Sequence, residues 1–122
     1  MKAAQARVLL TGASGGIGQA TARALLQAGA SLLLVARSAE RLEALSRDLT
    51  RQGAPAARLR WVAADLTNAN DLARVVQESA RLDCNVIVHN AGVPAFGRLD
   101  TLSPDTLGQS LATNLLAPMQ LT

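Results

Sequence analysis

A glycine-rich segment near the start of the chain has the residue types and spacing that hold a phosphate group. Residues Thr11 to Gly18 read TGASGGIG, between a short apolar run and a pattern typical of a helix. Because glycine has no Cβ atom, the backbone can turn sharply there and approach a pyrophosphate, whose charge is stabilised by free N–H groups at a helix start. A plain structural turn is the alternative, but the strand–turn–helix context is the condition that identifies a dinucleotide site. The sequence therefore predicts a phosphate-binding turn.

The end of the second apolar run indicates which dinucleotide binds. It reads Val35-Ala36-Arg37-Ser38, with no carboxylate. At this place an acidic residue would bind the ribose 2′-hydroxyl of NAD, whereas an arginine accommodates the 2′-phosphate of NADP. A guanidinium matches a phosphate in charge and geometry, and the hydroxyls of Ser14 and Ser38 are able to add contacts. We expect NADP(H) to be preferred over NAD(H); the alternative is that Arg37 is an ordinary surface arginine.

Asn114 occupies an unusual place in the last helical stretch. At 3.6 residues per turn it shares one face with Leu107, Leu111 and Pro118. A side-chain amide in an apolar stripe is costly unless it has partners. Pro118 also has no N–H to give to the carbonyl of Asn114. We expect the side chain and the carbonyl of Asn114 to be free to bind another group; a core asparagine satisfied by its neighbours is the alternative.

Four motifs in this order resemble those of the short-chain dehydrogenase/reductase family. They are Thr-Gly-x-x-x-Gly-x-Gly at 11–18, Asp65 after the third apolar run, the sequence HNAG at 89–92, where the family usually has NNAG, and NLLAP at 114–118. The resemblance implies that Asp65 contacts the adenine, and that Asn114 is the catalytic asparagine that holds a water in a proton relay. The expected cofactor-binding residues are Gly12, Ser14, Gly15, Gly16, Ile17, Gly18, Arg37, Ser38, Asp65, Leu66, Asn90, Ala91 and Gly92.

The rest of the family's catalytic machinery is missing from this sequence. In the family a serine acts with a Tyr-x-x-x-Lys pair, in which the tyrosine is the general acid or base and the lysine lowers its pKa. The 122 residues contain no tyrosine, and the single lysine is Lys2. The resemblance therefore implies an NADP(H)-dependent oxidoreductase with a small-molecule carbonyl or alcohol substrate, of which this chain is a truncated and inactive part. A non-catalytic module that binds or senses a dinucleotide is the alternative.

The elements that position these residues alternate between short apolar runs and helical patterns, which is typical of a parallel α/β fold. The run Leu32–Val35 does not alternate, which indicates a strand buried on both faces. Right-handed crossovers then give a sheet of order 3-2-1-4. We expect one domain, residues 1–122, that forms part of a Rossmann-type doubly wound parallel sheet. The expected strands are 7–11, 31–36, 59–64 and 85–89; the expected helices are 16–28, a helix capped by Ser38, 70–82, and a regular last helix with Ser103 as N-cap and Pro104 at its first position.

The composition argues against several other classes of function. The net charge is +3, but the basic residues are scattered, so we expect no nucleic-acid partner. No apolar run approaches the roughly 20 residues of a membrane span, and the N-terminus lacks the apolar core of a signal peptide, so we expect a cytoplasmic protein without a membrane partner. His89 is the single histidine and has no second ligand at metal spacing, so we expect no metal site. The single cysteine, Cys84, is expected to be a small structural hydrophobe.

The expected strand 85–89 lies at an edge of the predicted sheet without the usual protection of an edge. It contains no lysine, no proline and no inward charge. The last helix adds an apolar surface at Leu107, Leu111 and Leu115. A soluble monomer rarely leaves such a surface bare, so we expect a homodimer or a higher homo-oligomer.

Overall fold

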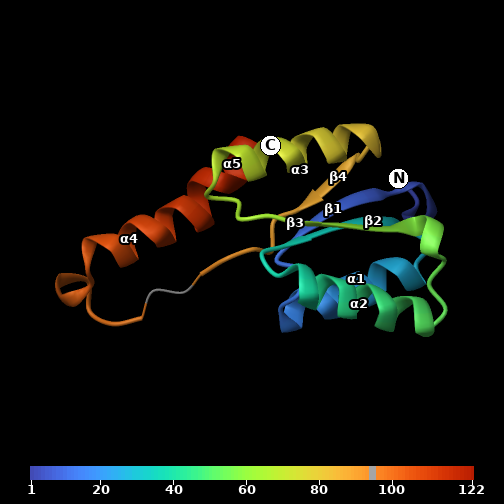
Figure 1. Ribbon diagram of the computed structural model, residues 1–122, viewed down its shortest axis with the longest axis horizontal. Helices are drawn as coiled ribbons and strands as arrows, with labels where there is room; N and C mark the ends of the chain where they lie inside the picture. Colours follow the sequence, from blue (N-terminus) through green and yellow to red (C-terminus); the bar gives the residue numbers. More distant parts are fainter. Residues whose placement is uncertain (94–95) are drawn as a thin grey trace.

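The computed structural model describes residues 1–93 and 96–122, and in this part of the chain four parallel strands form one sheet. Their order is β3-β2-β1-β4, which confirms the predicted topology and the Rossmann-type class (Figure 1). Val8 of the central strand β1 lies opposite Leu32 of β2 and Val86 of β4. The strands are β1 (Arg7–Thr11), β2 (Ser31–Ala36), β3 (Leu59–Ala63) and β4 (Val86–Val88).

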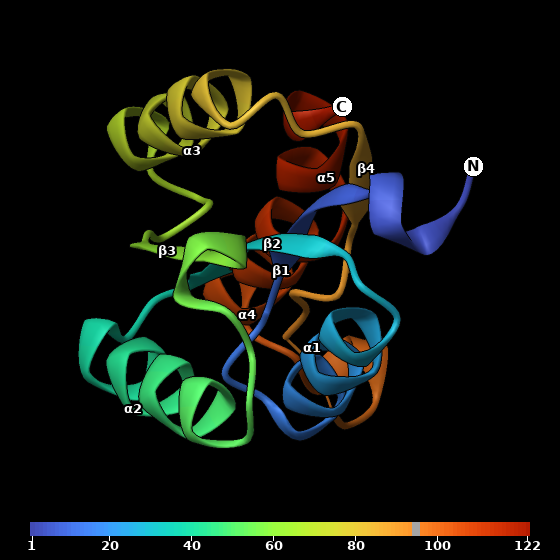
Figure 2. The same ribbon diagram turned by 90° about the vertical axis from the view of Figure 1, so that its right-hand side faces the viewer.

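Helices cover both faces of this sheet, as Figures 1 and 2 show. One face carries α1 and α2, and the other carries α3 and the C-terminal helix, so β1 and β2 are buried on both sides. This is why their sequences are apolar without alternation. The helices are α1 (Gly16–Gln27), α2 (Ala39–Arg51), α3 (Ala69–Arg81), α4 (Pro104–Leu111) and α5 (Ala117–Leu121), with short 3-10 turns η1 (Ala3–Gln5), η2 (Ala56–Arg58) and η3 (Leu99–Thr101).

The core is divided by the sheet into two apolar clusters. Leu10 and Leu34 pack with Leu42 of α2 on one side. Leu9 and Leu33 pack with Val75 of α3 on the other. Adjacent residues of each strand therefore serve opposite clusters, as the pleat of a strand requires.

Side-chain caps begin several of the helices. Oγ of Ser38 accepts the N–H of Arg41 at 3.2 Å, and Oγ of Ser103 accepts the N–H of Thr106 at 3.1 Å, with Pro104 at the first helical position. Both caps were predicted, because Ser before a helical pattern can satisfy an N–H that has no acceptor within the helix.

The fourth strand is shorter than the predicted 85–89. At its start the backbone N–H of Asn85 donates to the carbonyl of Arg7 at 2.9 Å, but the N–H of Arg7 is accepted by the side-chain Oδ1 of Asn85 at 2.8 Å, and Nδ2 donates to the carbonyl of Gln5 at 3.1 Å. At its end the chain turns away, because the N–H of Asn90 is bound by Oγ1 of Thr11. Strand β3 ends at Ala63 rather than at residue 64, and α3 is displaced by one residue from the predicted 70–82.

The last helical stretch was predicted as regular, and this was wrong. A π turn, η4 (Ala112–Leu116), separates α4 from α5, and the N–H of Ala117 donates to the carbonyl of Ala112, five residues earlier. The cause is Pro118, which has no N–H and whose ring would collide with the carbonyl four residues before it in a regular helix. Widening the turn by one residue relieves that collision.

Among the described residues, no helix combines the length and apolarity that crossing a membrane requires.

Candidate functional site

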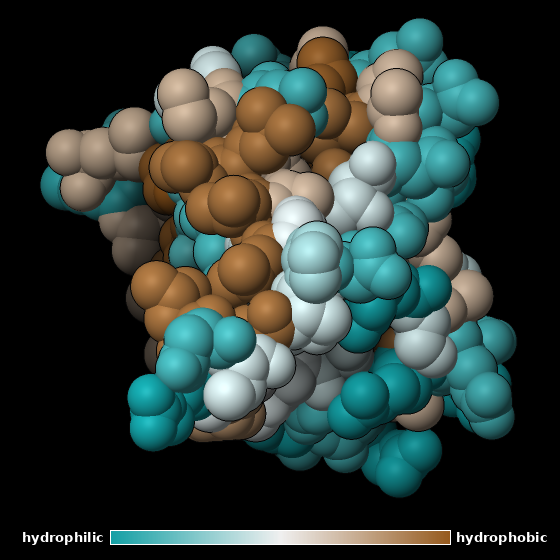
Figure 3. Space-filling model, turned by 90° about the vertical axis from the view of Figure 1, so that its left-hand side faces the viewer, coloured by the Kyte–Doolittle hydropathy of each residue, from teal (hydrophilic) through white to brown (hydrophobic). Residues whose placement is uncertain are grey.

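A cleft of about 380 Å³ opens at the carboxyl ends of the strands. Its walls come from the turn after β1, the tip of β2, the segments after β3 and β4, and one face of α4. Every predicted cofactor-binding residue lines it except Ser38. In the view of Figure 3, onto this end of the molecule, hydrophobic groups gather toward one side and hydrophilic groups toward the other. The cleft therefore has the place that ligands take in open parallel sheets.

Two glycines of the first turn are required by close packing. Gly12 has a φ of +64°, and a Cβ atom there would lie 2.8 Å from the carbonyl oxygen of Asn90. A Cβ atom at Gly18 would overlap the carbonyl oxygen of Gly12. Helix α1 and the segment after β4 can approach the turn only because these side chains are absent.

The start of α1 presents backbone donors to the cleft. Its N-cap, Gly15, has no side chain to offer, and the first N–H groups of a helix have no acceptor within it. The positive end of the helix dipole adds to their attraction for an anion. Nε2 of Gln19 donates to the carbonyl of Ser14 at 2.8 Å and so fixes the turn. Ile17 lines the cleft with its side chain 75% exposed, which places a large apolar group beside the donors.

Thr11 joins the glycine turn to the segment after β4. Its Oγ1 is buried, accepts the N–H groups of Asn90 and Ala91 at 3.0 Å each, and donates to the carbonyl of Val88 at 3.4 Å. Nδ2 of Asn90 donates to the carbonyl of Gly12 at 3.1 Å. Sequence reasoning assigned no role to Thr11, although a hydroxyl at the end of a fully buried strand was the signal for one, because such a group must find partners.

The side of the cleft at β2 and β3 carries charge of both signs. Oδ1 of Asp65 accepts the Oγ1–H of Thr67 at 2.6 Å and its N–H at 3.0 Å. These bonds, led by the one from the hydroxyl, lower the pKa of Asp65, and the charge of Arg37 lowers it further, so the carboxyl is ionised at neutral pH. Arg37 lines the cleft at the tip of β2, and Arg41, which sequence reasoning missed, lines it from the first turn of α2. Ser38 lies between them and caps α2.

The side chain of Asn114 is not free, contrary to the prediction. Its Oδ1 accepts the N–H of Val93 at 2.9 Å, and its Nδ2 donates to the carbonyl of Val93 at 2.8 Å and to Oγ of Ser110 at 3.1 Å. The amide pairs with a backbone unit of the segment after β4, so its neighbours satisfy it as in the alternative, but Asn114 is exposed and is not a core residue. The regular-helix face assumed for Asn114 was also wrong, because the π turn spans this residue. Gln109 and Thr113 of the same stretch line the cleft instead.

His89, the departure from the family's usual asparagine, lies away from the cleft. Its Nε2 is 3.0 Å from Oγ1 of Thr122, so it contacts the end of the C-terminal helix. Sequence reasoning also missed five further residues that line the cleft. These are Val35, Ala36, Ala64, Thr67 and Val93.

Comparison with known proteins agrees with this geometry. A family model described as short chain dehydrogenase matches residues 6–122. Dehydrogenase/reductase SDR family member 7B of Bos taurus is 36% identical over 122 residues, which cover 94% of this chain and 37% of that protein.

Two solved structures are similar in fold. A metagenomic short-chain oxidoreductase in complex with NADP has a TM-score of 0.85 and 37% identity, over 95% of this chain and 52% of that one. An alcohol dehydrogenase of the archaeon Thermococcus sibiricus, complexed with 5-hydroxy-NADP, has a TM-score of 0.85 and 34% identity, over 95% of this chain and 49% of that one. The chain thus spans about half the length, or less, of these proteins.

Proposed function

This chain belongs to the short-chain dehydrogenase family, and from that premise we propose that it is the NADP(H)-binding part of an oxidoreductase that acts on a carbonyl or alcohol substrate. One observation carries the proposal: the uncapped start of α1 and the arginine at the tip of β2 line a single cleft at the carboxyl ends of the strands. Donors for a pyrophosphate and a cation for a 2′-phosphate therefore line the same cleft.

The residues of the cleft fit the parts of this cofactor. The N–H groups of the turn from Gly15 to Gly18 would hold the pyrophosphate. Arg37 would hold the 2′-phosphate. Asp65, an ionised acceptor, and Leu66 would hold the adenine. When bound, the nicotinamide supplies or receives the hydride, and the chain's own part is to hold the cofactor in place. The tip of β2 carries no carboxylate that would repel the 2′-phosphate.

Asn114 has a positioning part in this proposal. Its amide ties Val93 to the π turn, so the segment that carries Asn90, Ala91 and Gly92 is held against the helix. Pro118 supplies no N–H to the carbonyl of Asn114. The side chain of Asn114 is already bonded to Val93. We therefore propose that the backbone carbonyl of Asn114 accepts the hydrogen bond from the water of the proton relay.

The 122 residues contain no tyrosine, and their lysine is Lys2. We therefore propose that this chain alone transfers no hydride, because it holds no group placed to give or take the proton at the substrate oxygen. The same lack favours the second candidate, a non-catalytic module that senses a dinucleotide. A redox sensor must bind NADPH and NADP⁺ with different affinities, whereas a site for the adenosine half binds both alike. Titration with the two forms separates the candidates.

The central test is cofactor preference. A charge-assisted hydrogen bond from a guanidinium contributes about 1.5–3 kcal/mol, so NADPH should bind about tenfold or more tightly than NADH. Titration of the purified chain with both, by calorimetry or ligand fluorescence, measures the difference. Equal affinities would contradict the assignment of NADP(H).

We extend the proposal to assembly: the 122-residue chain associates with itself. The support is the edge strand β4, with Ile87 at 36% exposure, and the exposed leucines of the last helical stretch, Leu111, Leu115 and Leu116.

A further inference from the structure

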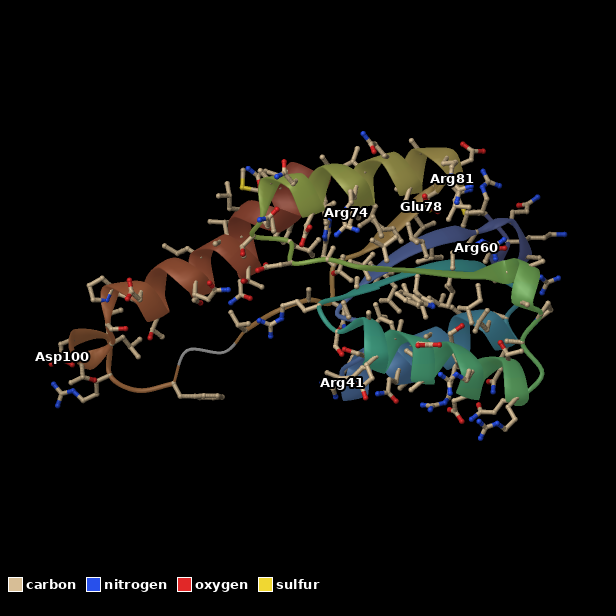
Figure 4. All side chains as sticks on the ribbon, in the orientation of Figure 1. Arg41, Arg60, Arg74, Glu78, Arg81 and Asp100 are labelled. Atoms are coloured by element: carbon tan, nitrogen blue, oxygen red, sulfur yellow. The ribbon has the colours of Figure 1, made fainter. Side chains whose placement is uncertain are left out.

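Arg41 stands in the candidate site although no motif singled it out. It is the third residue of α2, it lines the same cleft as Arg37, and Figure 4 shows it at the end of α2 that lies toward the carboxyl ends of the strands. On the premise of the proposed function, we propose that Arg41 is the second guanidinium of the 2′-phosphate site. The tip of β2 and the first turn of α2 would then select NADP(H) together.

The balance of charge requires more than Arg37. A phosphate monoester carries a charge of about −1.5 to −2 at neutral pH. Arg37 lies close enough to the ionised Asp65 to help lower the pKa of that carboxyl, so part of its charge already faces an anion. A single guanidinium beside a carboxylate cannot neutralise a dianion. Arg41, which lines the same cleft, would supply the missing charge.

The charges around Arg41 leave its guanidinium available. In the described part of the chain, neither Arg37 nor Arg41 forms an ion pair; the acids that do pair bind other arginines, among them Arg47 with Glu43 at 3.1 Å. Glu40 precedes Arg41 on α2 but is exposed and does not line the cleft. Asp65 is the carboxylate that lines it. Arg41 therefore lines the cleft without an ion-pair partner among the described residues, whereas Arg47 on the next turns of the helix is paired with Glu43.

The backbone of α2 supports the same ligand. Oγ of Ser38 accepts the N–H of Arg41 at 3.2 Å, and the carbonyl of Ser38 accepts the N–H of Leu42 at 3.1 Å, so the backbone that carries Arg41 is fixed. The N–H groups of Ala39 and Glu40, ahead of it, have no acceptor within the helix. The positive end of the helix dipole adds to the two side chains. Arg41 therefore lines the cleft from the positive end of α2, close in sequence to the tip of β2.

Two nucleotides that differ by one phosphate test this role. Affinities of the chain for adenosine 2′,5′-bisphosphate and for adenosine 5′-diphosphate are measured by calorimetry, for the unmodified protein and for Arg41→Ala, Arg41→Lys and Arg37→Ala. The control is Arg51→Ala, which removes the same charge from the far end of α2, outside the cleft. Circular dichroism checks that each variant is folded.

We expect Arg41→Ala to weaken binding of the 2′,5′-bisphosphate about tenfold and to change binding of the 5′-diphosphate less than twofold. Arg41→Lys should be intermediate, because lysine keeps the charge but loses the planar fork. Arg51→Ala should change neither. If Arg41→Ala binds the bisphosphate as the unmodified chain does, Arg41 has no such role, and the proposed function stands. If the unmodified chain binds neither nucleotide, the proposed function fails, and the role of Arg41 fails with it.

Discussion

The glycines of the turn differ in whether the packing of the fold requires them. Gly12 and Gly18 face backbone atoms that leave no room for a side chain. At Gly16 a Cβ atom would meet nothing within 4 Å, so the fold itself does not require glycine there. On the proposed function, glycine at that place would let the pyrophosphate of the cofactor approach the backbone.

This contrast gives a prediction with a built-in control. Gly18→Ala forces a Cβ atom against the carbonyl of Gly12, so it should lower the free energy of unfolding by about 1–3 kcal/mol. Gly16→Ala should leave stability unchanged or slightly higher, because it removes the flexibility of glycine, yet weaken NADPH binding. Urea unfolding and cofactor titration measure the two effects. A Gly18→Ala protein as stable as the unmodified chain would show that the turn can yield.

Thr11 supports a second prediction at this scale. Thr11→Val keeps the shape of the side chain but leaves the N–H groups of Asn90 and Ala91 without their acceptor. Unsatisfied buried groups cost about 1–3 kcal/mol each, so urea unfolding should show a loss of that order. Thr11→Ser retains the hydroxyl and should lose less. If valine and serine were equivalent, the hydroxyl would not be what joins the turn to the segment after β4.

The elements were predictable where one residue type decides the outcome. Ser38 and Ser103 began helices as expected, and the apolar run in β2 gave a strand buried on both faces. Tertiary partners decided the rest. Strand β4 begins one residue later than predicted, and at Asn85 the side-chain amide binds backbone groups of Gln5 and Arg7, far away in the sequence. No local pattern contains such a partner.

The candidate site shows the same division. The glycine turn, Arg37, Asp65 and the segment 90–92 were found because each follows a strand end, and parallel strands bring their carboxyl ends together. Arg41 was missed because nothing in its local sequence distinguishes it from the other arginines of α2. The partners of Asn114 could not be predicted because they lie on Val93, in another segment, and because the π turn changes the helical register at Asn114.

The π turn leads to a prediction at the scale of one helix. Pro118→Ala restores an N–H and removes the ring, so the stretch should relax toward a regular helix and turn Asn114 away from Val93. The N–H of Val93, now held by Asn114 at 2.9 Å, should then exchange with solvent faster, as measured by NMR. Asn114→Ala sets the rate expected for complete loss of this bond. Unchanged exchange in Pro118→Ala would mean that the π turn has a cause other than the proline.

In the whole molecule, the helices cover the central strands of the sheet more completely than its β4 edge. β1 and β2 lie between helices on both faces, whereas β4 is an edge of the sheet and α4 extends beyond the sheet (Figure 1). The exposed large apolar side chains include Leu111 at 61%, Leu115 at 55% and Met119 at 67%. Together they form an apolar surface along the last helical stretch, and a soluble monomer rarely leaves such a surface open.

The last prediction follows from this surface. A second copy that covers the edge strand, which has no lysine or proline, and the exposed apolar helix would lower the free energy of both. A two-fold arrangement covers both copies alike. Light scattering at micromolar concentration should therefore give a mass of at least twice the 12.7 kDa of one chain. The double variant Leu111→Glu with Leu115→Glu should shift the mass toward one chain, because it places charge on the buried side of the contact. Gln120→Glu, an exposed position of the same stretch, is the control and should change nothing. An unmodified chain that stays soluble with the mass of a monomer would show that the edge and the helix do not drive association.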